Sequence, residues 1–312
     1  MQYYDVSSIQ QLLKYDELIE ALEKCHLGNM PDSAHMLRNE PDNGSNQFVA
    51  LVGWQKNEII VVKLVGVFPD NLKLQPVQPS IQGVVVAFNA KTGTPEFAAD
   101  GAEMTFRKTA GVSGLGSRLL AREDAETLLI VGAGGLAPHV LQAHCAARPS
   151  INKVMIWNRT FEKAESLAKL WTTSERPVQA VTDLSQSTRG ADIISCVTMS
   201  DMPLIKGEDL QDGAHLDLVG AYLPTMREAD DAAMIKGRIY VDTRQNMEGA
   251  GDLCQPVERG LMSWDAVQGD LFDLCTKRVN ARHSDHEITI FKNVGGGHLD
   301  LFTTQFLSRK TL

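Results

Sequence analysis

The residues with the clearest chemical purpose are three small residues in VGAGGLAPHV: Gly132, Gly134 and Ala137. They follow an apolar run and precede an amphipathic stretch. Gly132 permits a sharp turn out of a strand, and Gly134 lets backbone N–H groups approach a pyrophosphate at a helix N-terminus. Ala137 stands where a small residue permits close helix–strand packing. The pattern predicts a nicotinamide- or flavin-dinucleotide turn, in which Gly132, Gly134, Gly135 and Leu136 contact the cofactor.

The next apolar run ends in Asn158-Arg159-Thr160, where the type of dinucleotide is decided. Enzymes that select NAD place an acidic residue about 20 residues past the glycines, where it binds the ribose 2′-hydroxyl. Here no carboxylate occurs until Glu162. Because a guanidinium and a hydroxyl suit a 2′-phosphate, we expect Asn158, Arg159 and Thr160 to bind NADPH, with NADH possible. The alternative is that Arg159 is a solvated turn residue.

Composition excludes several classes of protein. The 312 residues can bury one large core or two ordinary ones, and the net charge of −9 argues against a nucleic-acid partner. The sequence shows neither a secretory signal nor an apolar stretch long enough to span a membrane. The five cysteines are scattered and lack a CxxC pair, so we expect no metal site and no disulfide framework. The expected compartment is a reducing cytoplasm.

The remaining segments predict the elements that position these residues. Residues from Ser8 to about Cys25 carry Leu and Ile at helical spacing and predict an amphipathic helix. Three Val- and Ile-rich runs predict strands at Phe48–Trp54, Glu58–Val67 and Ser80–Asn89. From Ala125 onward, strands alternate with helices. The strands predicted there are Thr127–Val131, Lys153–Trp157, Val178–Val181, Asp192–Val197, His215–Leu218 and Ile239–Asp242.

This alternation is typical of a parallel sheet with helices on both faces. The predicted fold class is therefore α/β, with a Rossmann-type doubly wound parallel sheet inserted into a β-rich α+β unit. The β-rich unit is expected to span residues 1–118 and 288–312, and the nucleotide-binding unit residues 119–287. The tail HEITIFKNVGGGHLDLFTTQFL is expected to return one strand and one helix to the β-rich unit.

Several motifs together resemble the ornithine cyclodeaminase/mu-crystallin family. They are VVKLVGVFPDN, AKTGTPEFAADGAEMTFRKTAGVSGLGSRLLA, VGAGGLAPHVLQAH, LVGAYLPTMREADD followed by VDTR, and FKNVGGG near the end. Each lies in the family's order at about its spacing, so the resemblance covers nearly the whole chain. It implies a homodimer in which the β-rich unit is the dimerisation and substrate domain. Chemistry would then occur in a cleft between that domain and the Rossmann domain.

The resemblance also implies cations that bind the substrate. Lys63 occupies the position of the family's carboxylate-binding lysine, and a desolvated carboxylate needs such a partner. Arg107 matches the family's arginine between substrate and nicotinamide. Either could instead be an ordinary surface residue. Relatives carry Pro-x-Arg ahead of the first strands, but that position here holds Ser33, which leaves Arg38 as a third candidate.

The chain departs from the cyclodeaminases at Tyr222, in VGAYLPTMREAD. Those enzymes place an aspartate at this position as the acid and base of ammonia release. A phenol, with an ordinary pKa of about 10, suits that work poorly near neutrality. The sequence therefore resembles the ketimine-reductase branch. The READ segment that follows is expected to start a helix, with Arg227 and Glu228 supporting the site without touching substrate.

Further cofactor contacts follow from the family's matching positions. In an open α/β sheet, the ligand lies outside the carboxyl ends of the strands, which is where Thr198 and Val219 fall. Asn293 and Gly295 would approach the nicotinamide from the other domain, although the triple glycine beside them could equally be an ordinary turn. The full set expected from the resemblance is Ser80, Arg107, Thr198, Val219, Gly220, Asn293 and Gly295.

These observations predict an NAD(P)H-dependent reductase of a cyclic α-imino acid. Its substrate would be Δ1-pyrroline-2-carboxylate or Δ1-piperideine-2-carboxylate, and its product L-proline or L-pipecolate. Lys63, Arg107, Arg38 and Tyr222 are the residues expected at the reacting centre. The alternatives are an ornithine or lysine cyclodeaminase, against which Tyr222 and Arg159 argue, an alanine-dehydrogenase-like enzyme, and a non-catalytic ligand-binding protein of the mu-crystallin kind.

Overall fold

A computed structural model describes residues 1–311. They form two compact units: Met1–Lys108 with the segment from Gly296 onward, and Thr109–Gly295. The first boundary falls inside helix α3 (Gly101–Leu120), where no loop signal marks it. The units therefore differ from the predicted domains 1–118 with 288–312 and 119–287. The second half of α3 and strand β14 (Thr289–Lys292) both belong to the second unit.

The first unit is built on a mixed sheet. Within the described chain its six strands follow the order β1-β6-β5-β4-β3-β2, with β1 parallel to β6 and the other neighbours antiparallel. Strands β3, β4 and β5 match the predicted strands to within one residue at each end. Strands β1, β2 and β6 were not predicted, because none of them is a long apolar run. The strands are β1 (Gln2–Tyr4), β2 (Asp32–Asn39), β3 (Gln47–Gln55), β4 (Ile59–Val67), β5 (Ile81–Asn89) and β6 (Pro95–Asp100).

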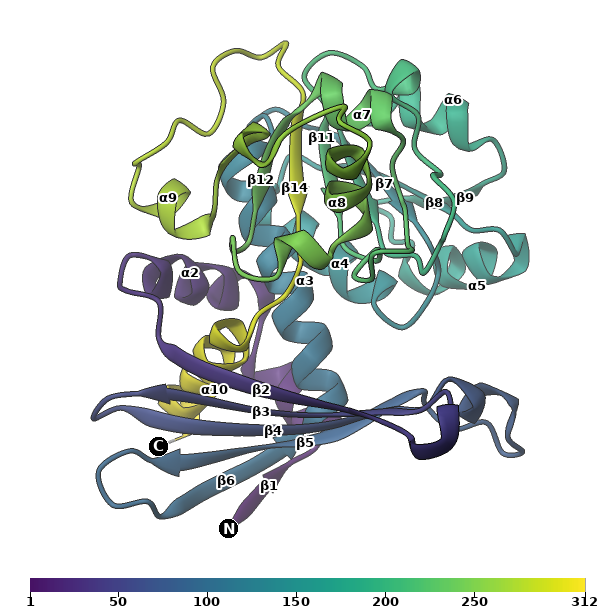
Figure 1. Cartoon of the computed structure of the whole chain (residues 1–312). Coiled ribbons are helices and arrows are strands. Elements are labelled where there is room, and N and C mark those ends of the chain that lie inside the picture. The colour runs from purple at the N-terminus through teal and green to yellow at the C-terminus, as the bar shows by residue number, and fades with distance from the viewer. Residues whose placement is uncertain (312) are drawn as a thin grey trace. The chain divides into compact units, whose positions relative to one another are not determined.

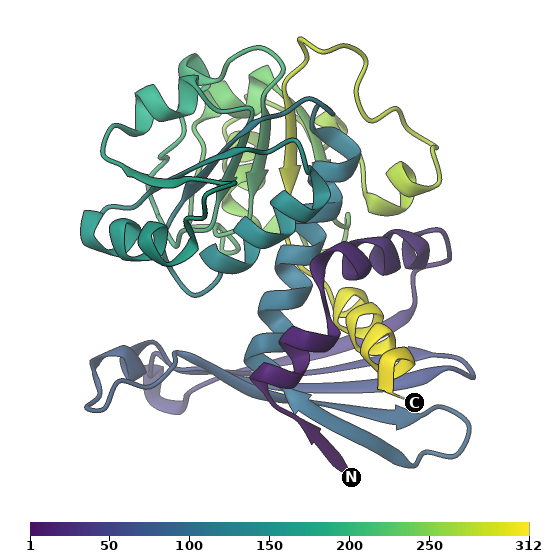
Figure 2. The ribbon, with the colours of Figure 1, turned by 180° about the vertical axis from the view of Figure 1, so that it is seen from behind.

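One face of this sheet is covered by helices and the other is exposed. Leu51, Val61 and Val85 point into the covered face, whereas Phe48 and Trp54 lie on the exposed face. Helix α10 packs on the covered face (Figures 1 and 2). The packing is close: a Cβ on Gly53 would lie 2.9 Å from the Leu301 side chain. The helices are α1 (Val6–Leu12), α2 (Tyr15–His26), the first half of α3 and α10 (Gly297–Thr311).

The single helix predicted from Ser8 to Cys25 is in fact two helices. The break falls at Leu13 and Lys14, and Lys14 has an extended backbone. The helical spacing of apolar residues continues across the break, and in α2 it places Leu18 and Leu22 in the core, where both are fully buried. A pattern of apolar residues therefore predicted the buried face correctly and missed the bend.

The second unit contains a fully parallel sheet in residues 109–295. Its eight strands follow the order β13-β12-β14-β11-β10-β7-β8-β9. The predicted strands are all present to within one residue, and β13 is additional. Strand β14, expected to return to the first unit, instead pairs between β11 and β12. The strands are β7 (Thr127–Val131), β8 (Lys153–Trp157), β9 (Val178–Val181), β10 (Ile193–Cys196), β11 (His215–Leu218), β12 (Arg238–Val241), β13 (Val267–Gly269) and β14.

Helices cover both faces of this parallel sheet. Helix α8 lies in front of the strands in Figure 1, and α3 lies behind them; the view is reversed in Figure 2. The chain order reverses between β7 and β10, which creates the switch point where open α/β sheets bind ligands. The helices are α4 (Ala137–Ala147), α5 (Phe161–Trp171), α6 (Leu184–Arg189), α7 (Asp231–Lys236), α8 (Gly251–Glu258) and α9 (Leu271–Cys275). No helix in residues 1–311 combines the length and apolar character needed to cross a membrane.

Candidate cofactor and substrate sites

The glycine turn has the backbone that a phosphate-binding loop requires. Gly132 adopts a φ of +114°, and a Cβ there would lie 2.9 Å from the Val197 carbonyl oxygen, so only glycine fits. At Gly134, no described atom lies within 4 Å of the place a Cβ would take. Helix α4 begins immediately afterwards, at Ala137. The turn thus presents open backbone beside a helix N-terminus, which favours a pyrophosphate.

The end of β8 is tied to this turn through Asn158. Its side-chain oxygen accepts the Ala133 N–H at 3.2 Å, and its amide nitrogen donates to the Thr160 carbonyl at 2.8 Å. Asn158 therefore shapes the corner, and exposed Arg159 and Thr160 are presented to solvent. A hollow beside the corner is lined by Ala133 and by residues of α5, namely Glu162, Lys163, Ser166, Leu167 and Leu170.

The loops that follow β10 and β11 are held by a buried carboxylate. Glu228 accepts the Thr198 N–H at 2.7 Å and the Thr198 hydroxyl at 2.8 Å. Its second oxygen accepts the N–H groups of Gly220 at 2.6 Å and Ala221 at 3.2 Å. Thr198 and Gly220 were expected to contact the cofactor, and these backbone donors point at Glu228. Any cofactor contact by these residues must use other atoms.

Asn293 and Gly295 lie where β14 ends and belong to the second unit, not to the substrate domain as predicted, because β14 pairs within the parallel sheet. The Asn293 amide nitrogen donates to the Thr109 carbonyl at 3.0 Å and to the Ser113 hydroxyl at 3.2 Å. Gly295 has a φ of +79° and donates its N–H to Asp242 at 2.7 Å. The turn after β14 is therefore an ordered part of the carboxyl edge of the sheet.

Behind Asn293 lies a buried polar network of serine, histidine and aspartate side chains, in which the two histidine nitrogens are used in the opposite sense to a hydrolase triad. Ser117 Oγ is 2.7 Å from His144 Nδ1, and His144 Nε2 is 3.1 Å from Asp217. Asp217 also accepts the hydroxyls of Ser113 and Ser195. All of these side chains are fully buried, so Ser117 cannot meet a substrate. The network has a structural role, because it orients the Ser113 hydroxyl that accepts a hydrogen bond from the Asn293 amide.

In the first unit, the structure brings Lys63 to a carboxylate and a second lysine. Lys63 Nζ lies 2.9 Å from Asp300 Oδ1, and Lys108 Nζ lies 3.2 Å from Asp300 Oδ2. The pKa of Lys63 is lowered from 10.5 to about 8: burial is the main cause, Asp300 opposes the shift and Lys108 adds to it. Burial acts to raise the pKa of Asp300, but the two lysines outweigh it and hold that pKa below its ordinary value.

Arg107 has a different set of partners. Its Nε donates to Glu103 at 2.9 Å, its Nη1 donates to the Leu13 carbonyl at 3.1 Å, and its guanidinium sits 4.5 Å from the centre of the Tyr15 ring. Consecutive helical residues point about 100° apart, and it is the neighbouring Lys108 that reaches Asp300. The predicted position of Arg107 between substrate and nicotinamide stays a prediction.

Arg38 is also separated from Lys63. Register pairs Arg38 with Phe48, and Lys63 with Leu51 and Val85. Because side chains alternate along a strand, Arg38 lies on the exposed face of the sheet and Lys63 on the covered face. Ser33, which occupies the family's arginine position, lies on the covered face, where a Cβ on Gly297 would come within 3.2 Å of its side chain.

Three other expected residues lie in loops or at strand ends. Ser80 immediately precedes β5, and its carbonyl accepts the Phe68 N–H at 2.7 Å. Val219 is buried and continues the β11 ladder by donating to the Cys196 carbonyl. Tyr222 is 46% exposed in the loop after Gly220. Its predicted place at the reacting centre stays a prediction.

The family model of the ornithine cyclodeaminase/mu-crystallin family matches residues 4–308. The chain belongs to this family. Protein SAR DEFICIENT 4 of Arabidopsis thaliana is 41% identical over 250 residues, which cover 79% of this chain and 76% of the relative. Delta(1)-pyrroline-2-carboxylate reductase of Paracoccus denitrificans is 40% identical over 232 residues, which cover 74% and 73%. These relatives agree with the resemblance seen in the motifs.

A solved structure supports the same assignment. The structure of Thermococcus litoralis Delta(1)-pyrroline-2-carboxylate reductase in complex with NADH and L-proline superposes with a TM-score of 0.92. The two sequences are 25% identical, and the match covers 99% of this chain and 97% of the other. The Rossmann-type fold class predicted from the sequence is confirmed by this likeness.

For this member of the ornithine cyclodeaminase/mu-crystallin family, sequence patterns had not singled out Lys108, Asp300 or Asp252. Lys108 stood beside Arg107, which drew attention as the better carboxylate ligand. Asp300 could have been noticed as an acidic residue in the apolar stretch HLDLF, a composition that requires a buried partner. Asp252 carried no comparable signal, since GDLC at a helix start is unremarkable.

Proposed function

We propose that this chain reduces a cyclic α-imino acid, Δ1-pyrroline-2-carboxylate or Δ1-piperideine-2-carboxylate, to L-proline or L-pipecolate with NAD(P)H. The observation that carries the proposal is the cluster of Lys63, Asp300 and Lys108. Its described members carry two ammonium groups and one carboxylate, so one positive charge remains when both lysines are protonated. A buried site with this surplus suits the carboxylate of one small substrate.

The residues of the second unit fit a dinucleotide. Gly132 has the left-handed backbone of the turn, Gly134 leaves space for a phosphate, and α4 begins at the same point. When bound, the nicotinamide supplies the hydride that the imine carbon receives. The tasks left to the chain are to hold the substrate carboxylate, to position the cofactor and to limit access of water.

Lys63 and Lys108 are the residues proposed to hold the substrate carboxylate. Each ammonium has three N–H donors, and one of them is directed at Asp300. Asp300 keeps the two amines apart and aligned, which pre-organises them for a second carboxylate. Arg107, which forms its bonds with Glu103 and Leu13, is assigned a supporting role in the fold of the first unit.

The corner after β8 supports a preference for NADPH. Asn158 is engaged with the backbone, so exposed Arg159 and Thr160 are the groups available to a 2′-phosphate. Arg is the favoured partner for such a dianion. The acidic residue that would select NAD is absent from the end of β8, where the chain reads Asn158-Arg159-Thr160.

The exposed face of the first unit's sheet supports a homodimer. Register places Met36, Phe48, Val52 and Trp54 on this face, and each of these side chains is more than two-fifths exposed. A contiguous apolar face on a sheet is typical of an interface. The proposed occupant is a second copy of the chain. A reducing compartment such as the cytoplasm suits the five free cysteines of the described chain.

The test is the loss of reduced-nicotinamide absorbance when the purified chain is mixed with Δ1-pyrroline-2-carboxylate. The expected result is rapid oxidation of NADPH, slower oxidation of NADH and formation of L-proline. Parallel reactions with Δ1-piperideine-2-carboxylate would rank the two ring sizes. Proline made from ornithine with catalytic NAD would instead identify a cyclodeaminase, and turnover of pyruvate with ammonia would identify an amino-acid dehydrogenase.

A further inference from the structure

Glu228 joins two loops of the second unit with a single carboxylate. One oxygen binds the loop after β10, through the N–H and hydroxyl of Thr198 at 2.7 and 2.8 Å. The other binds the loop after β11, through the N–H groups of Gly220 and Ala221 at 2.6 and 3.2 Å. The side chain is fully buried. All four interactions require an acceptor at Glu228, which an ionised carboxylate supplies completely.

The two loops touch where Glu228 binds them. A Cβ on Gly220 would fall 1.6 Å from the Thr198 carbonyl oxygen and 2.6 Å from Glu228 itself. The glycine turn joins the same contact, since Gly132 packs against the Val197 carbonyl. Three loops at the carboxyl edge of the sheet are thus fixed together, at the switch point between β7 and β10. This edge is where a dinucleotide binds in such folds.

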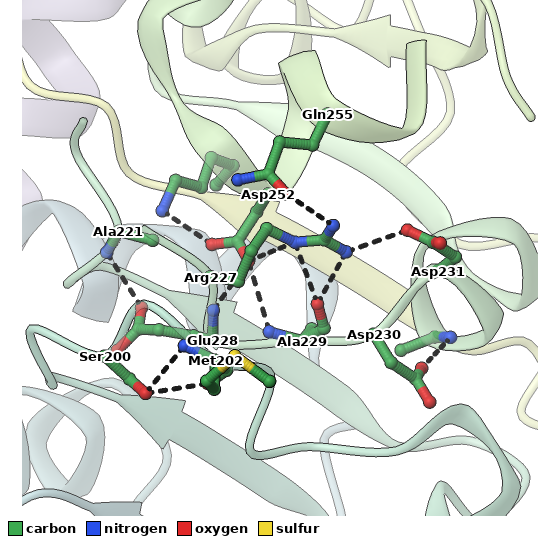
Figure 3. Close-up of polar contacts among 12 residues, drawn as sticks. Ser200, Met202, Ala221, Arg227, Glu228, Ala229, Asp230, Asp231, Asp252 and Gln255 are labelled. Carbon is green, nitrogen blue, oxygen red and sulfur yellow. Dashed lines mark hydrogen bonds and ion pairs between the residues drawn. The ribbon is translucent and has the colours of Figure 1, made fainter. Parts of the chain in front are cut away.

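A second buried carboxylate holds Glu228 in place. Asp252, in α8, accepts the backbone N–H groups of Glu228 at 2.8 Å and Ala229 at 3.1 Å. It also accepts the ammonium of Lys292 at 3.1 Å, and Arg227 lies 3.7 Å away (Figure 3). Arg227 also lies 3.0 Å from Asp231, which pairs with Arg259 at 2.7 Å, so the described cluster has three carboxylates and three cations and is neutral. The arrangement therefore has no surplus charge with which to bind an ionic substrate.

The charged groups around Glu228 shift its pKa in opposite directions. Burial raises the pKa of Glu228 from 4.5 to about 7, Lys292 of β14 lowers it and Asp252 of α8 raises it. Cys196 of β10 is a further titratable neighbour, and burial raises its own pKa well above 9.0. Protonation of Glu228 would place a hydrogen on one oxygen and make that oxygen a weaker acceptor for the N–H groups of its loop.

We propose that Glu228 is a positioning residue for the dinucleotide: its ionised carboxylate locks the Thr198 and Gly220 loops into the arrangement that receives the nicotinamide half. This inference rests on the proposed function, because it concerns the cofactor of the same reaction. Glu228 acts through the two loops and touches neither substrate nor cofactor. Loss of its charge should loosen the cofactor site and leave the lysine cluster of the first unit unaffected.

The test is a comparison of Glu228→Gln with the wild type in the binding of NADPH and NADH alone, followed by nucleotide fluorescence. The amide keeps the size of the side chain but replaces one acceptor with a donor. The dissociation constants should rise by at least about tenfold, and KM for the imino acid should change by no more than about twofold at saturating cofactor. Glu228→Asp, which keeps the charge but is shorter, should recover part of the affinity. Glu258→Gln, an exposed change at the end of the same α8, is the matched control.

The pH dependence separates positioning from mere stability. In the wild type, nucleotide affinity should fall as the pH drops below about 7, because Glu228 gains a proton there. Glu228→Gln should lose this acidic limb. If the variant does not fold, the wild-type titration alone still decides. Equal nucleotide affinity at pH 6 and 8 in the wild type, or unchanged nucleotide binding by folded Glu228→Gln, would overturn this inference but leave the proposed function standing. Absence of nucleotide binding by the wild type would overturn the proposed function as well.

Discussion

Each of the two units buries a cluster of lysine and carboxylate side chains, but the two clusters differ in net charge. In the first unit, Lys63 and Lys108 share one carboxylate, Asp300. In the second, the carboxylates of Glu228 and Asp252 are matched by Lys292 and Arg227, and their oxygens also accept backbone N–H groups. The first cluster has a positive charge to spare, and the second has none.

This difference indicates what each cluster does. Burying a charge is costly unless it is compensated, so an uncompensated charge that persists in the folded state points to a missing partner. The lysine cluster of the first unit carries one more positive charge than its carboxylate balances when both lysines are protonated. In the second unit, each oxygen of Glu228 and Asp252 already has a donor. The first cluster is suited to binding a ligand and the second to holding loops.

The largest expected effect is that of Lys63→Ala. Removing one member of a buried charge-assisted contact costs about 4 kcal/mol, so kcat/KM for the imino acid should fall about 1,000-fold. NADPH binding, which belongs to the other unit, should stay within about twofold. Steady-state kinetics measure kcat/KM for the imino acid, and nucleotide fluorescence measures NADPH binding. Lys56→Ala, an exposed change in the turn between β3 and β4, is the control. Loss of both imino-acid turnover and NADPH binding in Lys63→Ala would show that the two clusters are not independent.

The next largest effect distinguishes Lys108 from its neighbour. Lys108→Met should raise KM for the imino acid about 30-fold, since it removes one charge-assisted contact worth about 2 kcal/mol. Arg107→Met should instead lower the melting temperature, because it leaves buried Glu103 without its guanidinium at a cost of about 3 kcal/mol or more. Kinetics and thermal unfolding of both variants are the measurements. The opposite pattern would restore Arg107 as the carboxylate ligand that the family resemblance implied.

This adjacent pair illustrates what the sequence could not decide. The motif around Arg107 was recognisable, yet a rotation of about 100° per residue determines which side chain reaches Asp300. Lys63 and Asp300 are 237 positions apart in the chain, so no local pattern links them. By contrast, the strand from Thr127 to Val131 and the turn at Gly132 depend on neighbouring residues, and both were predictable.

Longer-range pairing explains the other corrections. Strand β14 was visible as an apolar run, but its place between β11 and β12 depends on partners more than 40 residues distant. The READ segment was expected to start a helix, and α7 does begin at Asp231, just beyond it. Glu228 could not be recognised as a buried acceptor, because its donors follow two other strands. Strands and turns that depend on neighbouring residues could be predicted from the sequence, whereas the pairing of charged residues far apart in the chain could not.

A smaller effect concerns pH and the lysine cluster. Burial lowers the pKa of Lys63 to about 8, so KM for the imino acid should rise above that pH, by up to about tenfold per pH unit. Between about 8 and 10.5 the unfolded chain holds a proton that the folded chain has lost, so Lys63 makes folding more favourable as the pH rises. A loss of affinity in this window therefore cannot be unfolding caused by Lys63. A pH profile of KM at saturating NADPH measures it, and a flat profile to pH 10 would contradict the role of Lys63.

The smallest expected effect is at the corner after β8, where Arg159 is exposed, so that water would screen its proposed contact with a 2′-phosphate. Arg159→Ala should raise KM for NADPH about fivefold, which corresponds to about 1 kcal/mol, and leave KM for NADH unchanged. Lys169→Ala, an exposed cation further along α5, provides the control for a general change in surface charge. Because NADH lacks the phosphate, the ratio of the two KM values isolates the contact. An equal increase for both nucleotides would mean that Arg159 supports the corner, as Asn158 does, and that selection between them lies elsewhere.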